Sequence, residues 1–417
     1  MKLVDSHSTA IPKGNLDGFK VHAKYDIISG FLVFLIALPL CLGISLASGY
    51  PAVAGIFTAI IGGVVATFIS NSELSIKGPA AGLIVIALGC VQEFGFTGGV
   101  DPAKDFQAYR LALGVGVVAG AYQIILGLFR VGILVNLFPK AAIHGLLASI
   151  GIIIISKQFP VLVGLSPQGS PLELLAGIPS FLTNMNPKVG VIGITGIIIV
   201  LGYGYIKNPK LKIIPAPMLM LLITVPMGTV MAIGLEGSYT FNNQIYELGQ
   251  KFLVNVPGNL LKAVTFPDFS GVVTETGIKY TVLFAIIGSL EGVISAKAID
   301  GIDPWGRKTN LDRDLLATGI ANTMSAFIGG LPMISEIVRS KANIDNGART
   351  RFANFYHGLF LLFCVALIPG VINQIPLAAL AALLVITGYR LASPNEFKSV
   401  YREGKDQFIV FVSTIFG

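Results

Sequence analysis

Apolar runs about as long as a bilayer is thick recur through the whole sequence, and they restrict the fold more than any other feature. A membrane-spanning helix needs about 20 consecutive, mostly apolar residues. Candidate spans cover residues 27–48, 52–70, 111–129, 141–156, 189–206, 213–235, 280–298, 315–328, 352–372 and 377–389, and a last segment begins near residue 408. The sequence therefore predicts an all-α polytopic membrane protein with about 13 segments, the last one truncated.

Composition agrees with a bilayer environment. Apolar residues make up 53% of the 417 residues and charged residues only 12%, whereas soluble domains are about a quarter charged. Cys41, Cys90 and Cys364 all lie in apolar segments, which argues against a disulfide framework. The net charge of +7 accompanies no basic and aromatic patch, so we expect no nucleic-acid partner.

Two short segments occupy matching positions in the two halves of the chain. Residues 80–92 follow Pro79 and residues 333–344 follow Pro332, each as the third segment of its half. The fifth spans also align without gaps from Pro139 and Pro376, which places Gly151 in register with Gly388. Paired, interrupted short segments are typical of an inverted-repeat transporter. We therefore divide the chain into an N-terminal segment (1–25), a first repeat (26–235), a connection (236–279) and an incomplete second repeat (280–417).

The distribution of basic residues predicts the orientation. Cytoplasmic loops carry an excess of Lys and Arg. With the N-terminus in the cytoplasm, the acidic stretches 92–105 and 236–279 fall outside the cell. The basic residues that then fall inside are Lys207, Lys210, Lys212, Arg307, Lys308, Arg313, Arg349, Arg351, Arg390, Lys398, Arg402 and Lys405. The sequence also shows no cleavable signal peptide, so we expect a multi-pass protein of the cell inner (plasma) membrane.

The two short segments suggest an anion site. Half-helices that meet near the bilayer midplane direct their N-terminal N–H groups and positive dipole ends at one place. The candidate residues at the two tips and in the first turn after them are Pro79, Ala80, Ala81, Ser335, Glu336, Ile337 and Arg339. The guanidinium of Arg339 suits an oxyanion, although a position at the cytoplasmic end of its helix would explain the residue equally well.

A second candidate site lies on span 280–298. Glu291 and Ser295 are four residues apart and therefore project from one helix face. A buried carboxylate with a hydroxyl suits a Na⁺ ion or a transferable proton. The alternative is a structural carboxylate that is neutralised by Arg339 or Lys297.

Signatures of other chemistries are missing from the sequence. It contains no Walker loop, no CxxC pair and no nucleophile elbow. We therefore expect neither ATP-driven transport nor enzymatic activity, and no cofactor other than a bound Na⁺ at Glu291 and Ser295.

Five motifs distributed over nearly the whole chain resemble the sulfate permease (SulP) family of anion transporters. They are Ala37-Leu-Pro-Leu, Ile76-Lys-Gly-Pro-Ala, Gly288-Ser-Leu-Glu, Asn310-Leu-Asp-Arg-Asp-Leu-Leu-Ala-Thr-Gly-Ile-Ala-Asn and Ile337-Val-Arg-Ser-Lys-Ala-Asn-Ile-Asp-Asn-Gly-Ala. The resemblance implies seven plus seven inverted segments, core and gate domains, and elevator-like movement of the core. It places the anion between Ala80 and residues 335–337, and it matches Arg339 to an arginine found in many members.

The resemblance has two departures. The sodium-coupled bicarbonate branch places an acid and a hydroxyl where this chain has Glu291 and Ser295, but it has a threonine where this chain has Ile337 and no arginine at the Arg339 position. Sodium coupling, proton coupling and exchange therefore stay open. The family normally adds a fourteenth segment and a cytoplasmic STAS domain, which often contacts the partner of a homodimer, so we expect this chain to be truncated.

These observations lead to three functional hypotheses. The first is a secondary active transporter of a small inorganic anion, bicarbonate or sulfate, coupled to Na⁺ or H⁺. The second is a proton-coupled nucleobase (uracil- or xanthine-like) permease or a dicarboxylate permease, although Arg339 suits a neutral ring poorly. The third is a membrane scaffold or sensor that transports nothing, which would not need paired half-helices.

Overall fold

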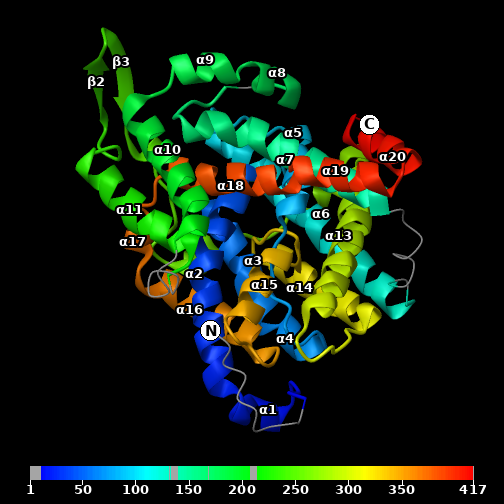
Figure 1. Cartoon of the computed structure of the whole chain (residues 1–417). Helices are drawn as coiled ribbons and strands as arrows, with labels where there is room; N and C mark the ends of the chain where they lie inside the picture. Colours follow the sequence, from blue (N-terminus) through cyan, green and yellow to red (C-terminus); the bar gives the residue numbers. More distant parts are fainter. Residues whose placement is uncertain (1–10, 131, 133–139, 168, 207–213, 417) are drawn as a thin grey trace. The chain divides into compact units, whose positions relative to one another are not determined.

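The computed structural model describes residues 11–130, 132, 140–167, 169–206 and 214–416 (Figure 1). Pro139, Lys207, Lys210 and Lys212, to which the sequence analysis assigned roles, lie outside these residues. The chain forms two compact units, and each unit takes segments from both halves of the sequence. Unit 1 contains residues 1–41, 53–135 and 259–367, and unit 2 contains residues 42–52, 136–258 and 368–417.

Unit 1 holds both short segments. Apart from α2 (Ala23–Ala47), which belongs to it as far as Cys41, its described elements are α1 (Leu16–Val21), α3 (Ala52–Val64), α4 (Ala66–Ile69), β1 (Lys77–Pro79), η1 (Ala81–Leu83), α5 (Ile84–Glu93), α6 (Pro102–Leu128), α12 (Leu260–Ala263), η6 (Phe269–Gly271), α13 (Glu275–Ile302), α14 (Leu311–Phe327), β4 (Met333–Ser335), α15 (Ile337–Asp345) and α16 (Phe352–Leu367). Helices α6 and α14 pack closely because small residues line their contact: a Cβ on Gly120 would lie 2.6 Å from Thr323 Oγ1.

Unit 2 is built around two helices that occupy equivalent positions in the two repeats. Its described elements are α7 (Lys140–Leu162), α8 (Pro171–Ala176), α9 (Ile178–Thr183), α10 (Pro187–Gly202), η3 (Tyr203–Tyr205), α11 (Ala216–Val230), β2 (Gly237–Phe241), β3 (Gln244–Leu248), η5 (Gln250–Phe252), α17 (Pro369–Ile372), α18 (Leu377–Leu391), α19 (Pro394–Glu403) and α20 (Lys405–Phe416). Helices α7 and α18 cross at the glycines that the sequence alignment paired: a Cβ on Gly151 would lie 2.5 Å from the Gly388 carbonyl oxygen, and one on Gly388 would lie 2.6 Å from the Gly151 carbonyl oxygen.

The predicted spans form helices, some with different ends, while α1, α8, α9, α12 and α19 lie outside the predicted spans. Seven helical segments of the described chain are long and apolar enough to cross a membrane. The predicted span 111–129 is the C-terminal part of α6, which begins nine residues earlier, at Pro102. The carboxylate of Asp101 caps this helix by accepting hydrogen bonds from the amides of Ala103 and Lys104, and Pro102 occupies the first helical position. The sequence analysis left residues 102–110 outside the span because they are polar, and this boundary was wrong.

Two short antiparallel pairs of strands were not predicted. Residues 333–335 were expected to begin a helix, but they form β4, which pairs with β1 in the register Lys77 to Ser335, Gly78 to Ile334 and Pro79 to Met333. Backbone groups that leave a helix at membrane depth must find partners inside the protein, and this ladder supplies them. The second pair, β2 and β3, is an exposed hairpin within the predicted connection 236–279.

Candidate functional site

The β1–β4 ladder brings the starts of the two half-helices together. The first half-helix (η1 and α5) begins directly after β1, and the second (α15) begins directly after β4. Two further hydrogen bonds extend the ladder at its ends, from Ala80 N to the Pro332 oxygen (3.3 Å) and from Glu336 N to the Ile76 oxygen (2.8 Å). Because the strands are antiparallel, the helices leave from opposite ends of a three-residue ladder, which is about 10 Å long.

Arg339 is the buried cation of this site. Its side chain lies in the first turn of α15 and is 0% exposed. Nη1 lies 3.5 Å from Cys41 Sγ, while Nε and Nη2 have no hydrogen-bond partner. The guanidinium packs against β1, because a Cβ on Gly78 would lie 2.2 Å from Nη1. An arginine that only followed the positive-inside rule would be exposed at the membrane surface, so its burial favours the ligand-binding interpretation of the sequence.

Glu336 links the two half-helices. It is the N-cap residue of α15, yet its side chain makes no capping bond there. Instead, Oε1 accepts a hydrogen bond of 3.4 Å from the amide of Ala81, in the first turn of the other half-helix. A carboxylate is favoured at this place by the positive end of the helix dipole.

The other predicted residues of the tips differ in exposure and in partners. Pro79 and Ala80 are buried, and Ala80 is only 2% exposed. The hydroxyl of Ser335 is held by Lys77, whose Nζ donates to Ser335 Oγ at 2.8 Å. The side chain of Ile337 is 41% exposed. Small or apolar side chains at Ala80, Ala81 and Ile337 leave backbone amides as the groups that these positions can offer an anion.

The structure also brings Glu291 to the first half-helix. A Cβ on Gly82 would lie 2.0 Å from Glu291 Oε1, and Glu291 Oε2 is a buried oxygen without a hydrogen-bond partner. Ser295 is buried one turn further along α13. Glu291 and Arg339 are both described by the structure, and no ion pair within 4.0 Å joins them. Arg339 therefore does not neutralise Glu291 by direct contact, which was one of the alternatives from the sequence.

A buried ion pair beneath the ladder was not found from the sequence. Lys77 Nζ lies 2.7 Å from Asp314 Oδ2, with side chains 2% and 3% exposed, and also donates to Thr318 Oγ1 at 3.0 Å. Asn322 adds two bonds to the backbone of Met333, accepting from its amide at 2.7 Å and donating to its carbonyl at 3.1 Å. The sequence does contain an indication of this pair. Lys77 and Asp314 are ionisable residues beside or within predicted spans, where charges are rare and usually paired.

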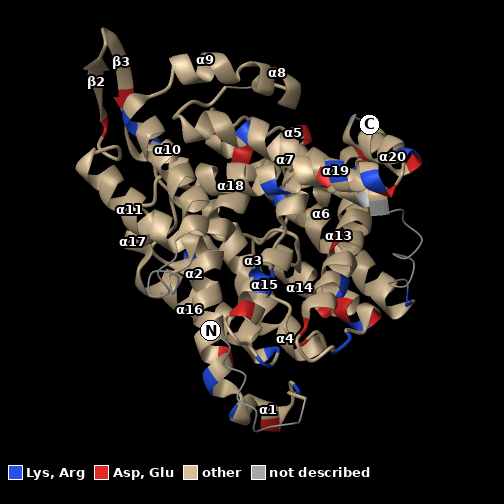
Figure 2. Cartoon of the chain, in the orientation of Figure 1, with Lys and Arg blue, Asp and Glu red and all other residues tan. Residues whose placement is uncertain are grey.

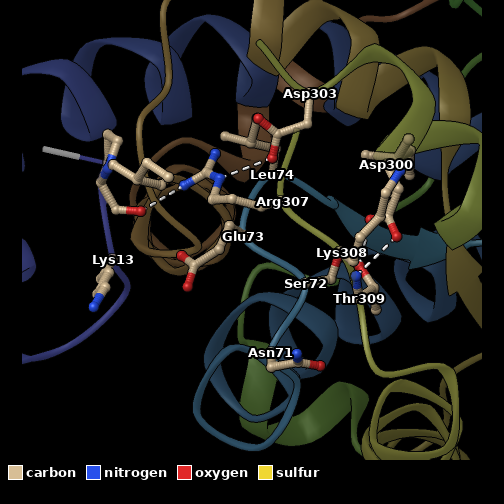
Figure 3. A pocket seen from close by; sticks show the side chains of 13 residues that line it. Lys13, Asn71, Ser72, Glu73, Leu74, Asp300, Asp303, Arg307, Lys308 and Thr309 are labelled. Atoms are coloured by element: carbon tan, nitrogen blue, oxygen red, sulfur yellow. Dashed lines mark hydrogen bonds and ion pairs between the residues drawn. The ribbon is translucent and has the colours of Figure 1, made fainter. Parts of the chain in front are cut away.

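A cavity of about 320 Å³ lies in another part of unit 1 (Figure 3). It is lined by the N-terminal residues Ile11, Pro12 and Lys13, the loop 71–74, and Ile299, Asp300, Asp303, Arg307, Lys308 and Thr309. The dashed lines of Figure 3 show that Arg307 and Asp300 are bound to the wall itself, Arg307 to Asp303 and Asp300 to Thr309. This cavity contains none of the residues that the sequence analysis singled out for binding.

Many charged residues of unit 1 lie near one end of the unit. Figure 2 shows most of the ribbon of α2 and α3 uncoloured, while blue and red residues gather near α1, α4 and the adjoining ends of α13 and α14. Arg307, Arg313 and Arg351 belong to this end, where they bond to backbone carbonyl groups. That this end faces the cytoplasm stays a prediction from the sequence.

Two interrupted segments at matching positions, whose half-helices begin at one shared strand ladder, are typical of inverted-repeat membrane transport proteins. The family model of the sulfate permease family matches residues 24–414, and the chain belongs to that family. This membership confirms the resemblance found in the motifs and the expectation that the protein is not an enzyme.

Named relatives are distant but cover most of the chain. The chain is 25% identical to the "Putative sulfate transporter YvdB" of Bacillus subtilis (strain 168), covering 95% of this chain and 70% of the relative. It is also 25% identical to the "Bicarbonate transporter BicA" of Picosynechococcus sp. (strain ATCC 27264 / PCC 7002 / PR-6), over 88% of this chain and 62% of the relative. The "Sulfate transporter 2.1" of Arabidopsis thaliana is 21% identical, over 94% of this chain and 57% of its own length.

Solved structures show the same fold. The transmembrane domain of a cyanobacterial bicarbonate transporter, BicA, superposes with a TM-score of 0.77 at 22% identity, covering 95% of this chain and 94% of that domain. The overall structure of SLC26A9 superposes with a TM-score of 0.75 at 15% identity, over 94% of this chain and 62% of that one. These matches confirm the predicted fold class, a mainly helical membrane protein with inverted repeats.

Proposed function

We propose that this protein is a secondary active transporter of a small inorganic anion, sulfate or bicarbonate. The anion binds between the starts of the two half-helices, where the residues Pro79, Ala80, Ala81, Ser335, Glu336, Ile337 and Arg339 form the site. The proposal extends to coupling with H⁺ or Na⁺, elevator-type alternating access, a cytoplasmic N-terminus, and a homodimer in a longer form of the protein.

One observation carries this proposal. Arg339 is completely buried, and its Nε and Nη2 have no hydrogen-bond partner. A buried donor without a partner costs about 1–3 kcal/mol, and more when it is charged. An oxyanion accepts two parallel hydrogen bonds from a guanidinium and would remove this cost. The nearby starts of two half-helices add electropositive backbone groups to the same region.

Glu291 and Ser295 are the proposed ligands of the coupling ion. Na⁺ takes oxygen ligands, and Glu291 Oε2 together with Ser295 supplies two of them from α13. A Na⁺ site would need further oxygens, and Ile337 offers no side-chain oxygen. A proton needs only one carboxylate.

Uptake into proteoliposomes tests the proposed function. Purified protein should accumulate labelled sulfate or bicarbonate under an imposed gradient of pH or Na⁺, while labelled uracil should stay outside. Uptake of uracil without any anion would establish the nucleobase permease instead. No flux of any of the three compounds, from vesicles in which the protein is shown to be folded, would favour the scaffold.

A further inference from the structure

Glu336 places a negative charge of the protein itself where a bound anion would sit. Its carboxylate accepts a hydrogen bond from the Ala81 amide, 3.4 Å away, although Glu336 belongs to the other half-helix. The η1 and α5 segment continues without a break from Ala81 to Glu93, so this amide stands at the positive end of a 13-residue helix. A substrate anion bound at the same helix start would compete with the carboxylate for this amide.

The cation of the site is not used by Glu336. No ion pair within 4.0 Å joins Glu336 to Arg339, and Arg339 keeps Nε and Nη2 without hydrogen-bond partners. The guanidinium therefore keeps two unused donor atoms, whereas the amide of Ala81 is occupied by a carboxylate. An anion that reaches the guanidinium comes close to the Glu336 charge as well.

The charged and titratable groups near Glu336 come from five elements. Glu291 of α13 is near enough to repel it, and Arg339 of α15 attracts it. Cys41 of α2 also faces this region, next to Arg339. Lys77 of β1 directs its Nζ toward Asp314, Thr318 and Ser335 instead, and His357 of α16, buried near Arg339, makes no hydrogen bond with either ring nitrogen.

The negative charges of the site oppose the binding of an anion. With both carboxylates ionised, Glu291 and Glu336 together carry two negative charges, and Arg339 carries one positive charge. Bicarbonate would add a third negative charge and sulfate a third and a fourth to this partly buried region, which is strongly unfavourable. A proton on Glu336 removes one negative charge and also the acceptor that occupies the Ala81 amide.

We propose that Glu336 is a tethered competitor of the substrate, and that its protonation opens the anion site. The proton comes from the aqueous side from which the anion enters, binds a carboxylate oxygen of Glu336, and is released on the other side when the carboxylate returns to the Ala81 amide. No covalent bond of the anion changes, and one proton moves with each anion. This inference rests on the proposed function and assigns coupling to Glu336, whereas the sequence analysis assigned it to Glu291 and Ser295.

The pH dependence of sulfate uptake tests this assignment. Sulfate keeps its charge between about pH 5.5 and about pH 8, so any change of uptake in this range belongs to the protein or to the driving force. With the internal and external pH kept equal and labelled sulfate exchanged against unlabelled sulfate, the apparent affinity of the wild-type protein should rise as the pH falls, by up to tenfold per unit for one linked proton. In Glu336→Gln, which cannot carry the negative charge, the change should be less than about twofold over the range.

A second readout follows the proton itself. A pH-sensitive dye enclosed in the vesicles should report acidification when an inward sulfate gradient drives the wild-type protein. Glu336→Gln should still exchange sulfate but give no acidification, while Glu336→Asp should keep a proton signal because it keeps a carboxylate. Asp345→Asn is the matched control, because Asp345 is an exposed carboxylate on the same helix, α15, and pairs with Lys341; it should retain both the pH dependence and the acidification.

The possible results separate the two proposals. Sulfate exchange with an unchanged pH dependence in Glu336→Gln would overturn the role of Glu336 and leave anion transport standing. A loss of proton coupling in Glu291→Gln, with coupling retained in Glu336→Gln, would have the same consequence. If Glu336→Gln does not fold, Glu336→Asp decides the question, and a lost proton signal in this folded variant would contradict the proposal. Failure of the wild-type protein to move any anion would overturn both proposals.

Discussion

At the scale of single residues, the site depends on charges that are buried at membrane depth. Such charges are rare because the bilayer interior does not solvate them, so each one needs a partner or a ligand. Lys77 and Asp314 are partners of one another, whereas the guanidinium of Arg339 keeps Nε and Nη2 without a partner. We therefore expect different consequences when these residues are replaced.

Removal of the arginine should weaken binding without harming the fold. In Arg339→Ala the anion loses a bidentate, charge-assisted contact, which is worth about 1.5–3 kcal/mol per hydrogen bond, so its apparent affinity should fall at least about tenfold. The variant should still fold, because only one nitrogen of the guanidinium makes a hydrogen bond in the structure.

Two measurements check this prediction. They are sulfate uptake and the rise of the unfolding temperature on addition of sulfate, which the wild-type protein should show and Arg339→Ala should lack. Lys341→Ala is the matched control, since Lys341 lies on the same helix but is exposed and paired with Asp345. Uptake by Arg339→Ala equal to that of the wild-type protein would remove Arg339 from the site.

Separation of the buried ion pair should instead destabilise the fold. Lys77→Ala or Asp314→Ala leaves an unpaired buried charge, and breaking such a pair costs about 3–5 kcal/mol of the free energy of unfolding. The double variant Lys77→Met with Asp314→Leu should lose less than either single variant, because neither charge remains. The measurement is the unfolding temperature of each variant and of the wild-type protein in detergent. Single variants as stable as the wild-type protein would show that the pair does not stabilise the fold.

At the scale of elements, the β1–β4 ladder decides where the half-helices begin. It pairs backbone groups that the interrupted segments would otherwise leave unsatisfied within the bilayer. It also explains the glycine before the first half-helix, since there is no room for a side chain between Gly78 and the guanidinium of Arg339.

A methyl group at this position should disturb the site and spare the rest of the fold. In Gly78→Ala the new Cβ would lie 2.2 Å from Arg339 Nη1, so the end of the arginine side chain must move. We expect sulfate affinity to fall about tenfold, the effect of losing about 1.4 kcal/mol of binding.

A nearby glycine provides the control for this substitution. Gly292→Ala places its Cβ 3.7 Å from Ile334 Cγ2, an ordinary contact distance, and should bind as the wild-type protein does. Titration of sulfate-dependent thermal stabilisation measures both affinities. Equal affinities of the two variants would show that Arg339 does not need its present position.

At the scale of the whole molecule, the two repeats and the two compact units are different divisions of the chain. The predicted repeats cover residues 26–235 and 280–417, but each unit takes residues from both of them. The matching short segments belong to unit 1, and the matching helices α7 and α18 belong to unit 2. The division into repeats stays a prediction from the sequence.

The orientation in the membrane can be tested on exposed positions. In a background without the three native cysteines, Ser238→Cys in the β2–β3 hairpin should react with a membrane-impermeant maleimide added to intact cells. Lys398→Cys in α19 should react only after the membrane is opened, because basic segments stay in the cytoplasm. Labelling in the opposite order would reverse the predicted orientation.

Much of the architecture follows from the sequence alone. Long apolar runs must become helices in a bilayer, since no other open structure satisfies the backbone there, and this predicted α2, α3, α7, α13 and α18. The Gly-Pro break at Pro79 and the Leu-Pro break at Pro332 identified the half-helices for the same local reason. The candidate residues Arg339, Glu336 and Glu291 were found because charge is costly within apolar segments.

Other features depend on contacts between segments that are distant in the sequence. The pairing of β1 with β4 joins residues more than 250 positions apart, as do the bonds from Lys77 to Ser335 and from Ala81 to Glu336. Local composition does not specify such partners, and residues 333–335 were therefore predicted as helix although they form a strand. The sequence determined which segments lie in the membrane and which residues are unusual there, whereas only the tertiary structure decided which buried charges have partners, because that depends on which segments meet.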